Sequence, residues 1–169
     1  MKGIGRYLVL TAMSLSAFGA AAADADLLRE MADRVAIEQL MWDYTRALDT
    51  LDADAYAAVY TADGEFGSGA NASKGSAALK EMINGVRRGR EEREAKGEAQ
   101  PAMYHMTANH HIEFIDADHA RVHSYWMTTF GAVGRDVPAR VAAVGRGIDD
   151  LVRVNGKWLI KTRNVAPQD

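Results

Sequence analysis

The sequence predicts a single α+β domain in which helices come first and antiparallel strands follow. Three observations predict it: apolar residues at helical spacing in residues 27–52, strand-like alternation from Met103 onward, and an Asn155-Gly156 pair that is typical of a two-residue hairpin turn. The chain has 169 residues, of which 48% are hydrophobic and 25% are charged, so it is long enough to bury one substantial core.

Residues 1–23 are predicted to be a secretory signal peptide that precedes a domain over residues 24–169. Lys2 and Arg6 form a basic head, an apolar run follows, and three alanines ending at Ala23 supply a cleavage site. The alternative is an uncleaved membrane anchor, although the apolar run is shorter than the roughly 20 residues of a spanning helix. We therefore expect a periplasmic or secreted protein that is cleaved after Ala23.

Charge and cysteine content exclude several classes of partner and site. The net charge is −3, and cleavage would remove two basic residues and make the chain more acidic. This argues against a nucleic-acid partner, which requires a basic face. The absence of cysteine excludes disulfides, thiol catalysis and cysteine-based zinc sites.

Three helices are expected in the first part of the chain. The first ends near Thr50, and its apolar stripe comprises Ile37, Leu40, Met41, Tyr44, Leu48 and Leu51. A short helix over residues 53–60 leads to a strand around Glu65 and Phe66. A third helix, capped near Ser76, carries Leu79, Met82, Ile83 and Val86 on one face. Its mixed-charge tail, residues 87–98, is predicted to be a solvated helix end or loop, with a substrate-gating lid as the alternative.

Four strands are expected in the second part of the chain. They cover residues 103–115, 120–130, 140–154 and 157–165, and the Asn155-Gly156 turn joins the last two. Strand alternation places His105, Thr107, Asn109, His111 and Glu113 on one face. The other face would carry His110 together with Met106, Ala108, Ile112 and Phe114, which patterning alone would bury. One possibility is that both faces are covered, one by the pocket and the other by a partner subunit. The alternative is a bulge that switches the faces partway along the strand.

Three segments resemble the SnoaL-like branch of the nuclear transport factor 2-like superfamily: YTRALDTLDADAYAAVYTADGEF, YHMTANHHIEFIDADHARVHSYW and DDLVRVNGKWLIKTR. The shared features are a Tyr-x4-Asp-x2-Asp helix end, a histidine with an asparagine four residues later, and a closing Trp-x4-Arg strand. The resemblance implies a curved antiparallel sheet wrapped on three helices, a conical pocket and dimers through the sheet. Such folds host dehydratases, cyclases, isomerases and epoxide hydrolases, but also binding modules, so the fold alone does not decide the function.

The resemblance to scytalone and bile-acid dehydratases implies that Asp52 and His105 act together in the pocket. A carboxylate can hold one imidazole tautomer while the imidazole transfers a proton. Asp52 also suits the N-cap of the helix that starts at Ala53, and Asp54 could fill either role. Asp49 is expected to end the first helix or to pair with a basic residue.

The other site residues come from the same three segments. Tyr44 would bind a substrate oxygen or stay in the core, and Asn109 would be a pocket donor or an edge group. Ser124, Trp126 and Thr128 share one face of their strand. If the resemblance sets the register, Trp126 lines the pocket as a flat wall for an aromatic ligand; the alternative is a tryptophan in the core. We expect His110 and His111 to be structural or exposed. Trp158 and Arg163 are expected to be structural. No metal site is expected, because the histidines lack a ligand spacing such as HExxH.

Together these features predict a cofactor-free lyase that acts on a small aromatic or polycyclic molecule. His105 would be the acid or base, Asp52 its partner, and Tyr44 and Asn109 orienting donors, with water or a small carbonyl fragment as the leaving group. A non-catalytic periplasmic binding or accessory subunit is one alternative, and an isomerase or polyketide-cyclase-like enzyme is another. A homodimer through the sheet is expected in each case.

Overall fold

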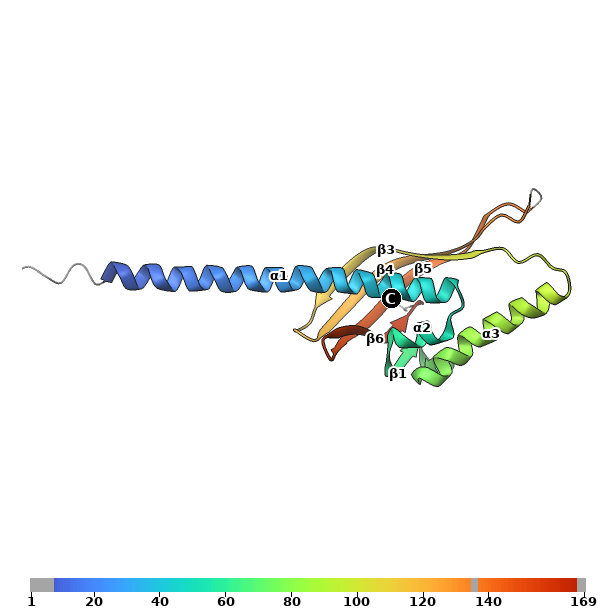
Figure 1. Cartoon of the computed structure of the whole chain (residues 1–169), viewed down its shortest axis with the longest axis horizontal. Helices are drawn as coiled ribbons and strands as arrows, with labels where there is room; N and C mark the ends of the chain where they lie inside the picture. Colours follow the sequence, from blue (N-terminus) through green and yellow to red (C-terminus); the bar gives the residue numbers. More distant parts are fainter. Residues whose placement is uncertain (1–7, 135–136, 167–169) are drawn as a thin grey trace, which may run out of the picture. The chain divides into compact units, whose positions relative to one another are not determined.

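The computed structural model describes residues 8–134 and 137–166, with side chains from residue 24 onward. The helices are α1 (Leu8–Asp49), α2 (Ala53–Ala58), the short 3-10 helix η1 (Gly69–Asn71) and α3 (Gly75–Ala95). The strands are β1 (Tyr60–Phe66), β2 (Ser73–Lys74), β3 (Met103–Phe114), β4 (His119–Phe130), β5 (Arg140–Val154) and β6 (Lys157–Asn164) (Figure 1). The chain from Ile37 onward forms one compact unit, and the residues up to Ala36 form another.

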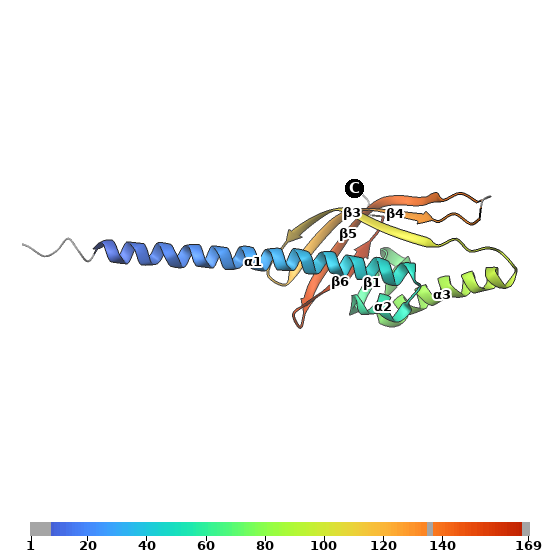
Figure 2. The same ribbon diagram turned by 45° about the horizontal axis from the view of Figure 1, so that its top comes forward.

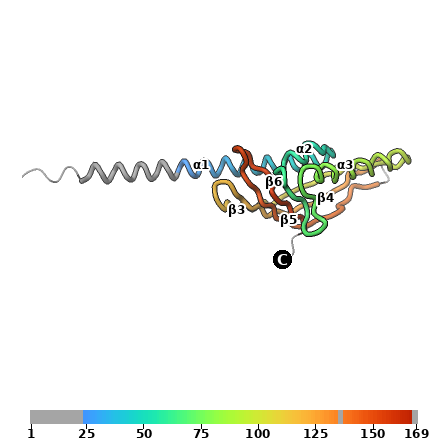
Figure 3. Tube along the Cα trace, turned by 90° about the horizontal axis from the view of Figure 1, so that it is seen from below, coloured from blue at the N-terminus to red at the C-terminus, as the bar shows by residue number. Residues whose placement is uncertain are grey.

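The strands form one curved sheet in the order β2-β1-β6-β5-β4-β3, which confirms the predicted α+β fold. One pair departs from the antiparallel prediction, because β1 runs parallel to β6. Parallel neighbours need a long connection, and β1 and β6 are separated by most of the domain sequence. In Figure 3, α2 and α3 lie together on one side of β3 and β5.

The predicted signal peptide falls partly outside the described residues, and its residues from Leu8 onward belong to α1. Lys2 and Arg6 lie outside them altogether, and the side chains of residues 1–23 are not described, so the cleavage site stays a prediction. Within the described part of the chain, no helix is long and apolar enough to cross a membrane.

The core lies between the helices and the concave face of the sheet. The predicted stripe of α1 is buried at Ile37, Met41 and Tyr44, and α3 contributes Leu79 and Ile83. Complete burial of such a side chain stabilises the fold by about 1.5–3 kcal/mol. These contacts hold the two helices on the sheet and leave the end of α1 beside β3.

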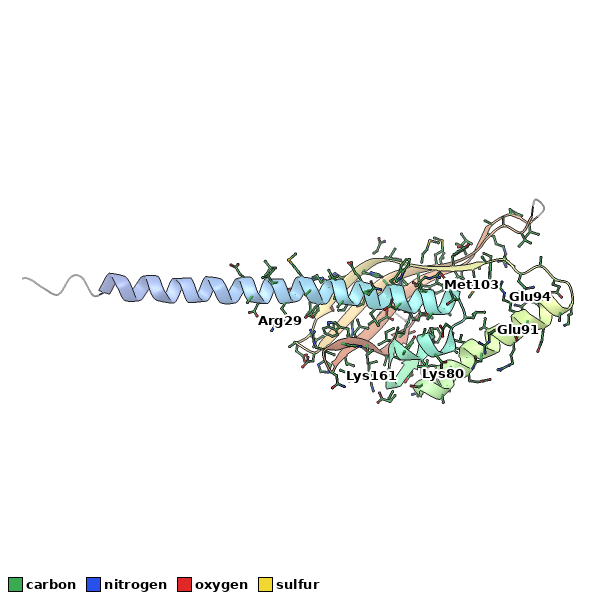
Figure 4. The ribbon with its side chains drawn as sticks, in the orientation of Figure 1. Arg29, Lys80, Glu91, Glu94, Met103 and Lys161 are labelled. Atoms are coloured by element: carbon green, nitrogen blue, oxygen red, sulfur yellow. The ribbon has the colours of Figure 1, made fainter. Side chains whose placement is uncertain are left out.

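Helix α3 differs from its prediction at one end and agrees at the other. It begins at Gly75, and Lys74 at the N-cap makes no side-chain capping bond, so the predicted cap near Ser76 is wrong. Gly75 has a φ of 77°, a conformation that glycine adopts without strain. The charged tail continues as helix to Ala95, and Glu91 and Glu94 project from it in Figure 4, which confirms a solvated helix end.

A bulge in β3 resolves the conflict between its two faces. The register with β4 shifts between Ala108 and His111, and Asn109 has a left-handed φ of 54°. Before the bulge His105 faces the inside of the sheet; after it Ile112, which is buried, does so. After the bulge the even-numbered residues of β3 therefore face inward, whereas strict alternation would have turned them outward.

The outer face of the sheet carries exposed apolar side chains on β3, β4 and β5. They include Tyr104, Met106, Tyr125, Val141 and Val144. Figure 2 shows these three strands side by side, extending together away from β1 and β6. The surface is of the kind that a second copy could cover, and the homodimer stays a prediction.

Candidate active site

An inner cavity of about 230 Å³ lies between the C-terminal end of α1 and the concave face of the sheet. Helix α1 and the strands β1 and β3 to β6 contribute to it, together with the residue that follows β6. Its lining residues are Tyr44, Leu48, Phe66, His105, Thr107, Trp126, Thr128, Ala143, Arg163 and Val165. Four predicted site residues are thus brought together: Tyr44, His105, Trp126 and Thr128.

His105 is held by the carboxylate of Asp49. One oxygen of Asp49, Oδ1, accepts from the backbone N–H of His105 at 2.9 Å and lies 2.8 Å from the ring Nδ1. Only 19% of the His105 side chain and 11% of the Asp49 side chain are exposed. Because a carboxylate accepts, the neutral ring carries its proton on Nδ1 and leaves Nε2 as a proton acceptor.

The fold explains why Asp49, and not Asp52, is the partner of His105. Strand β3 is at the edge of the sheet, so the free N–H of His105 can bond outside the ladder. Helix α1 ends at Asp49, and Leu51, with a φ of 55°, then turns the chain away. Asp52 follows this turn, and its carboxylate accepts from the N–H of Ala55 at 3.0 Å.

The predicted pairing of Asp52 with His105 is therefore wrong, and its capping alternative is confirmed. Asp54 does neither, because its carboxylate lies 2.6 Å from the ammonium of Lys80 at the surface. The helix-end position that the sequence assigned to Asp49 is correct, but the contact with a histidine of a distant strand was missed.

Trp126 forms one wall of the inner cavity. Its Nε1 donates to the carbonyls of Arg146 and Val165, both at 2.9 Å. The indole lies directly over Gly145, where an added Cβ would be only 2.5 Å from its Cζ2 atom. Gly145 thus permits the flat position of the indole, a requirement that the sequence alone did not reveal.

A buried charge pair borders the inner cavity through one of its members, Arg163. Arg163 forms an ion pair with Asp149, and both side chains are almost completely buried. The Arg163 guanidinium also stacks on the Tyr44 ring, with its central carbon 4.2 Å from the ring centroid. Burial raises the pKa of the Asp149 carboxyl to about 6, although Arg163 opposes this rise.

The ring of Tyr44 packs against the rings of Tyr56 and Tyr60. The hydroxyls of Tyr56 and Tyr60 lie 3.1 Å from each other. Burial raises the pKa of Tyr56 and of Tyr60 well above the ordinary value, so both stay neutral. Arg163 was predicted to be structural and is also a cavity residue. The sequence carried no signal for this role, because only the register of β6 with β5 places Arg163 opposite Asp149.

Two predicted binding residues do not line the inner cavity. Asn109 is exposed at the bulge, and Ser124 is buried with its hydroxyl unpaired among the described residues. His111 is exposed on the outer face near Glu113, as expected. No group of three or more histidine, aspartate or glutamate side chains in the described residues is arranged to hold a metal ion.

Comparison with known proteins agrees with this architecture. The SnoaL-like domain model matches residues 29–164. An NTF2-like protein with a cystatin-like fold from Novosphingobium aromaticivorans is similar over 86% of this chain and 88% of its own, with 23% identity and a TM-score of 0.69. No curated protein matches the sequence significantly.

Two further structures from the same species are similar at slightly higher identity. One, provisionally assigned as a scytalone dehydratase, is 25% identical over 80% of this chain and 84% of its own, with a TM-score of 0.63. The other, provisionally assigned as an aromatic ring hydroxylase, is 26% identical over 80% and 89%, with a TM-score of 0.62.

Proposed function

This chain belongs to the family of SnoaL-like domains, and we propose that it is a cofactor-free lyase that acts on a small aromatic molecule. The observation that carries the proposal is the Asp49–His105 hydrogen bond of 2.8 Å at the wall of the inner cavity. This arrangement leaves Nε2 of His105 as a base of fixed orientation, which general acid–base catalysis requires.

The size and walls of the cavity support the choice of substrate. A volume of about 230 Å³ is below the roughly 300–1,000 Å³ of drug-sized pockets, which favours a molecule of one or two rings over a larger polycycle. Trp126, Phe66 and Leu48 supply apolar surface for a ring. The names given to the two relatives above, a dehydratase and an aromatic ring hydroxylase, also favour an aromatic substrate.

In the proposed reaction, Nε2 of His105 removes a proton from the carbon next to a carbonyl group of the substrate. Asp49 stabilises the imidazolium that forms, because its negative charge lies 2.8 Å from Nδ1. Arg163 and Tyr44 stabilise the negative charge that develops on the carbonyl oxygen. The imidazolium then returns the proton to the leaving oxygen, so that water departs and a conjugated carbonyl product remains.

A non-catalytic binding protein is the second candidate, and one observation favours it. The same Asp49 oxygen that contacts the ring also accepts from the His105 backbone, so the contact also fastens the end of α1 to the edge strand. In that case the inner cavity would hold a ligand without reaction.

A panel of aromatic β-hydroxy ketones tests the proposal, because loss of water gives a conjugated product that absorbs in the near ultraviolet. We expect turnover of some panel members, and a decrease of roughly 100-fold or more in His105→Ala with little change in affinity. His111→Ala is the matched control on the same strand and should retain activity. Binding of panel members without any product would favour the second candidate.

Export and dimerisation are further parts of the proposal. We expect the native protein to begin near Asp24, and an intact Met1 by mass spectrometry would contradict export.

We also expect a homodimer that covers the outer face around Tyr125 and Val144. Tyr125→Lys should produce a monomer in sedimentation experiments, and a wild-type protein that is already monomeric would exclude the dimer.

A further inference from the structure

A second cavity, here called the edge cavity, lies between α1 and the edge strand β3. It has a volume of about 240 Å³, and its lining includes Glu38, Trp42 and Thr45 from α1 and His105, Thr107 and His110 from β3. His105 and Thr107 also line the inner cavity. The imidazole of His105 is therefore bordered by two cavities.

The lining of the edge cavity favours water. Glu38, Thr45 and His110 add polar side chains to the two shared residues, beside the larger apolar side chains of Met41, Trp42 and Met106. His110 Nε2 is buried and has no hydrogen-bond partner among the described residues, and ordered water commonly satisfies such atoms. A water molecule occupies roughly 30 Å³ in the liquid, so the volume is sufficient for several.

The bulge in β3 is what gives the edge cavity this character. By shifting the register after Ala108, it turns His110 to the same side of the strand as His105. With strict alternation the two rings would lie on opposite faces. The left-handed backbone at Asn109 thus places a second imidazole near the first, in a cavity that Glu38 also borders.

We propose that the edge cavity is the route by which water and protons reach His105 when the inner cavity is filled. Asp49 occupies Nδ1, so Nε2 is the ring nitrogen that exchanges protons, and it would do so where the ring borders both cavities. Water in the edge cavity remains in contact with the ring. It takes a proton from the imidazole and gives another back, so the charge of the ring is the same before and after the exchange. Use of this route in catalysis rests on the proposed function, whereas access to the ring does not.

Chemical modification of His105 tests access without any substrate. Diethyl pyrocarbonate reacts with an unprotonated imidazole nitrogen, and mass spectrometry locates the product. Thr45→Met fills the edge cavity. Among the described residues the native hydroxyl donates to the carbonyls of Met41 and Trp42 in its own helix, so no hydrogen bond between elements is lost. Ala143→Met fills the inner cavity, so it supplies the filled state in which the edge cavity is tested. Exposed His111 is the internal reference in every sample.

We expect His105 to remain open to modification in Ala143→Met, and the addition of Thr45→Met to that variant to slow modification by about tenfold, equivalent to ~1.4 kcal/mol. Protection of His105 by Ala143→Met alone, or no further slowing when Thr45→Met is added, would each overturn the proposal. If Thr45→Met does not fold, Thr45→Ile makes the same test with a smaller side chain. Loss of lyase activity in the substrate panel would leave this result unaffected, so the two proposals can fail separately.

Discussion

Replacing Asp49 by asparagine tests the partner of His105. The two side chains have nearly the same shape, so the change removes the charge and leaves the volume. In the native protein Asp49 Oδ1 contacts both the backbone N–H and the ring Nδ1 of His105. An asparagine oxygen can still accept, but its amide group can also donate to Nδ1 and favour the opposite tautomer.

The expected magnitude follows from these two contacts. Hydrogen bonds to a charged group contribute about 1.5–3 kcal/mol and neutral ones about 0.5–1.5, so we expect Asp49→Asn to cost roughly 1–3 kcal/mol of unfolding free energy. Loss of a correctly oriented base commonly costs about 10²–10⁴ in rate. We therefore expect kcat to fall by roughly 100-fold, with KM nearly unchanged.

Asp52→Asn is the matched control, because it makes the same chemical change three residues away. Asparagine caps a helix about as well as aspartate, so urea unfolding and turnover should both remain close to wild type. Asp52→Ala should cost about 1 kcal/mol of stability and leave kcat unchanged.

The assay is turnover of the best substrate from the panel, measured together with urea unfolding of each variant. A fall in kcat with Asp52→Asn and none with Asp49→Asn would refute the assignment. So would full additivity of Asp49→Asn with His105→Ala, because residues that act as one unit show non-additive effects.

Three other changes have expected outcomes. Gly145→Ala should displace the Trp126 indole, costing about 1–3 kcal/mol of stability and changing the tryptophan fluorescence, because the new Cβ would lie 2.5 Å from the ring. Asn109→Val should cost about 1–2 kcal/mol in urea unfolding, because a β-branched residue tolerates the left-handed bulge poorly. Burial lowers the pKa of His110 below 6.5, so the unfolded chain binds its proton first and stability should fall as pH drops below 6.5; His110→Phe should reduce that slope.

Each of these changes has a control in the same chain. Gly131→Ala places its Cβ at ordinary distances of 3.6 Å or more and should be much better tolerated than Gly145→Ala. Asn109→Gly should be close to neutral, because glycine adopts positive φ freely. His111→Gln should leave the pH slope unchanged, and an equal loss of slope in both histidine variants would exclude burial of His110 as its cause.

Much of the fold could be predicted from the sequence, because periodicity reports which side of each element is buried. The stripe of α1 from Ile37 to Tyr44 is buried, the 140–154 strand has the predicted bounds, and Asn155 and Gly156 have positive φ angles. The parallel pairing of β1 with β6 was not predictable in this way, since alternation carries no information about the direction of a neighbouring strand.

For the site, the family resemblance carried by the sequence indicated which strand segments contribute, and His105, Trp126 and Thr128 of those segments line the inner cavity. Only the tertiary structure decided between Asp49 and Asp52, which have the same chemistry and lie three residues apart. The choice depends on the left-handed turn at Leu51 and on the free N–H at the edge of the sheet, and neither can be read from residue spacing. The inward position of Arg163 likewise depends on its burial opposite Asp149, a partner 14 residues away that only sheet register brings into contact.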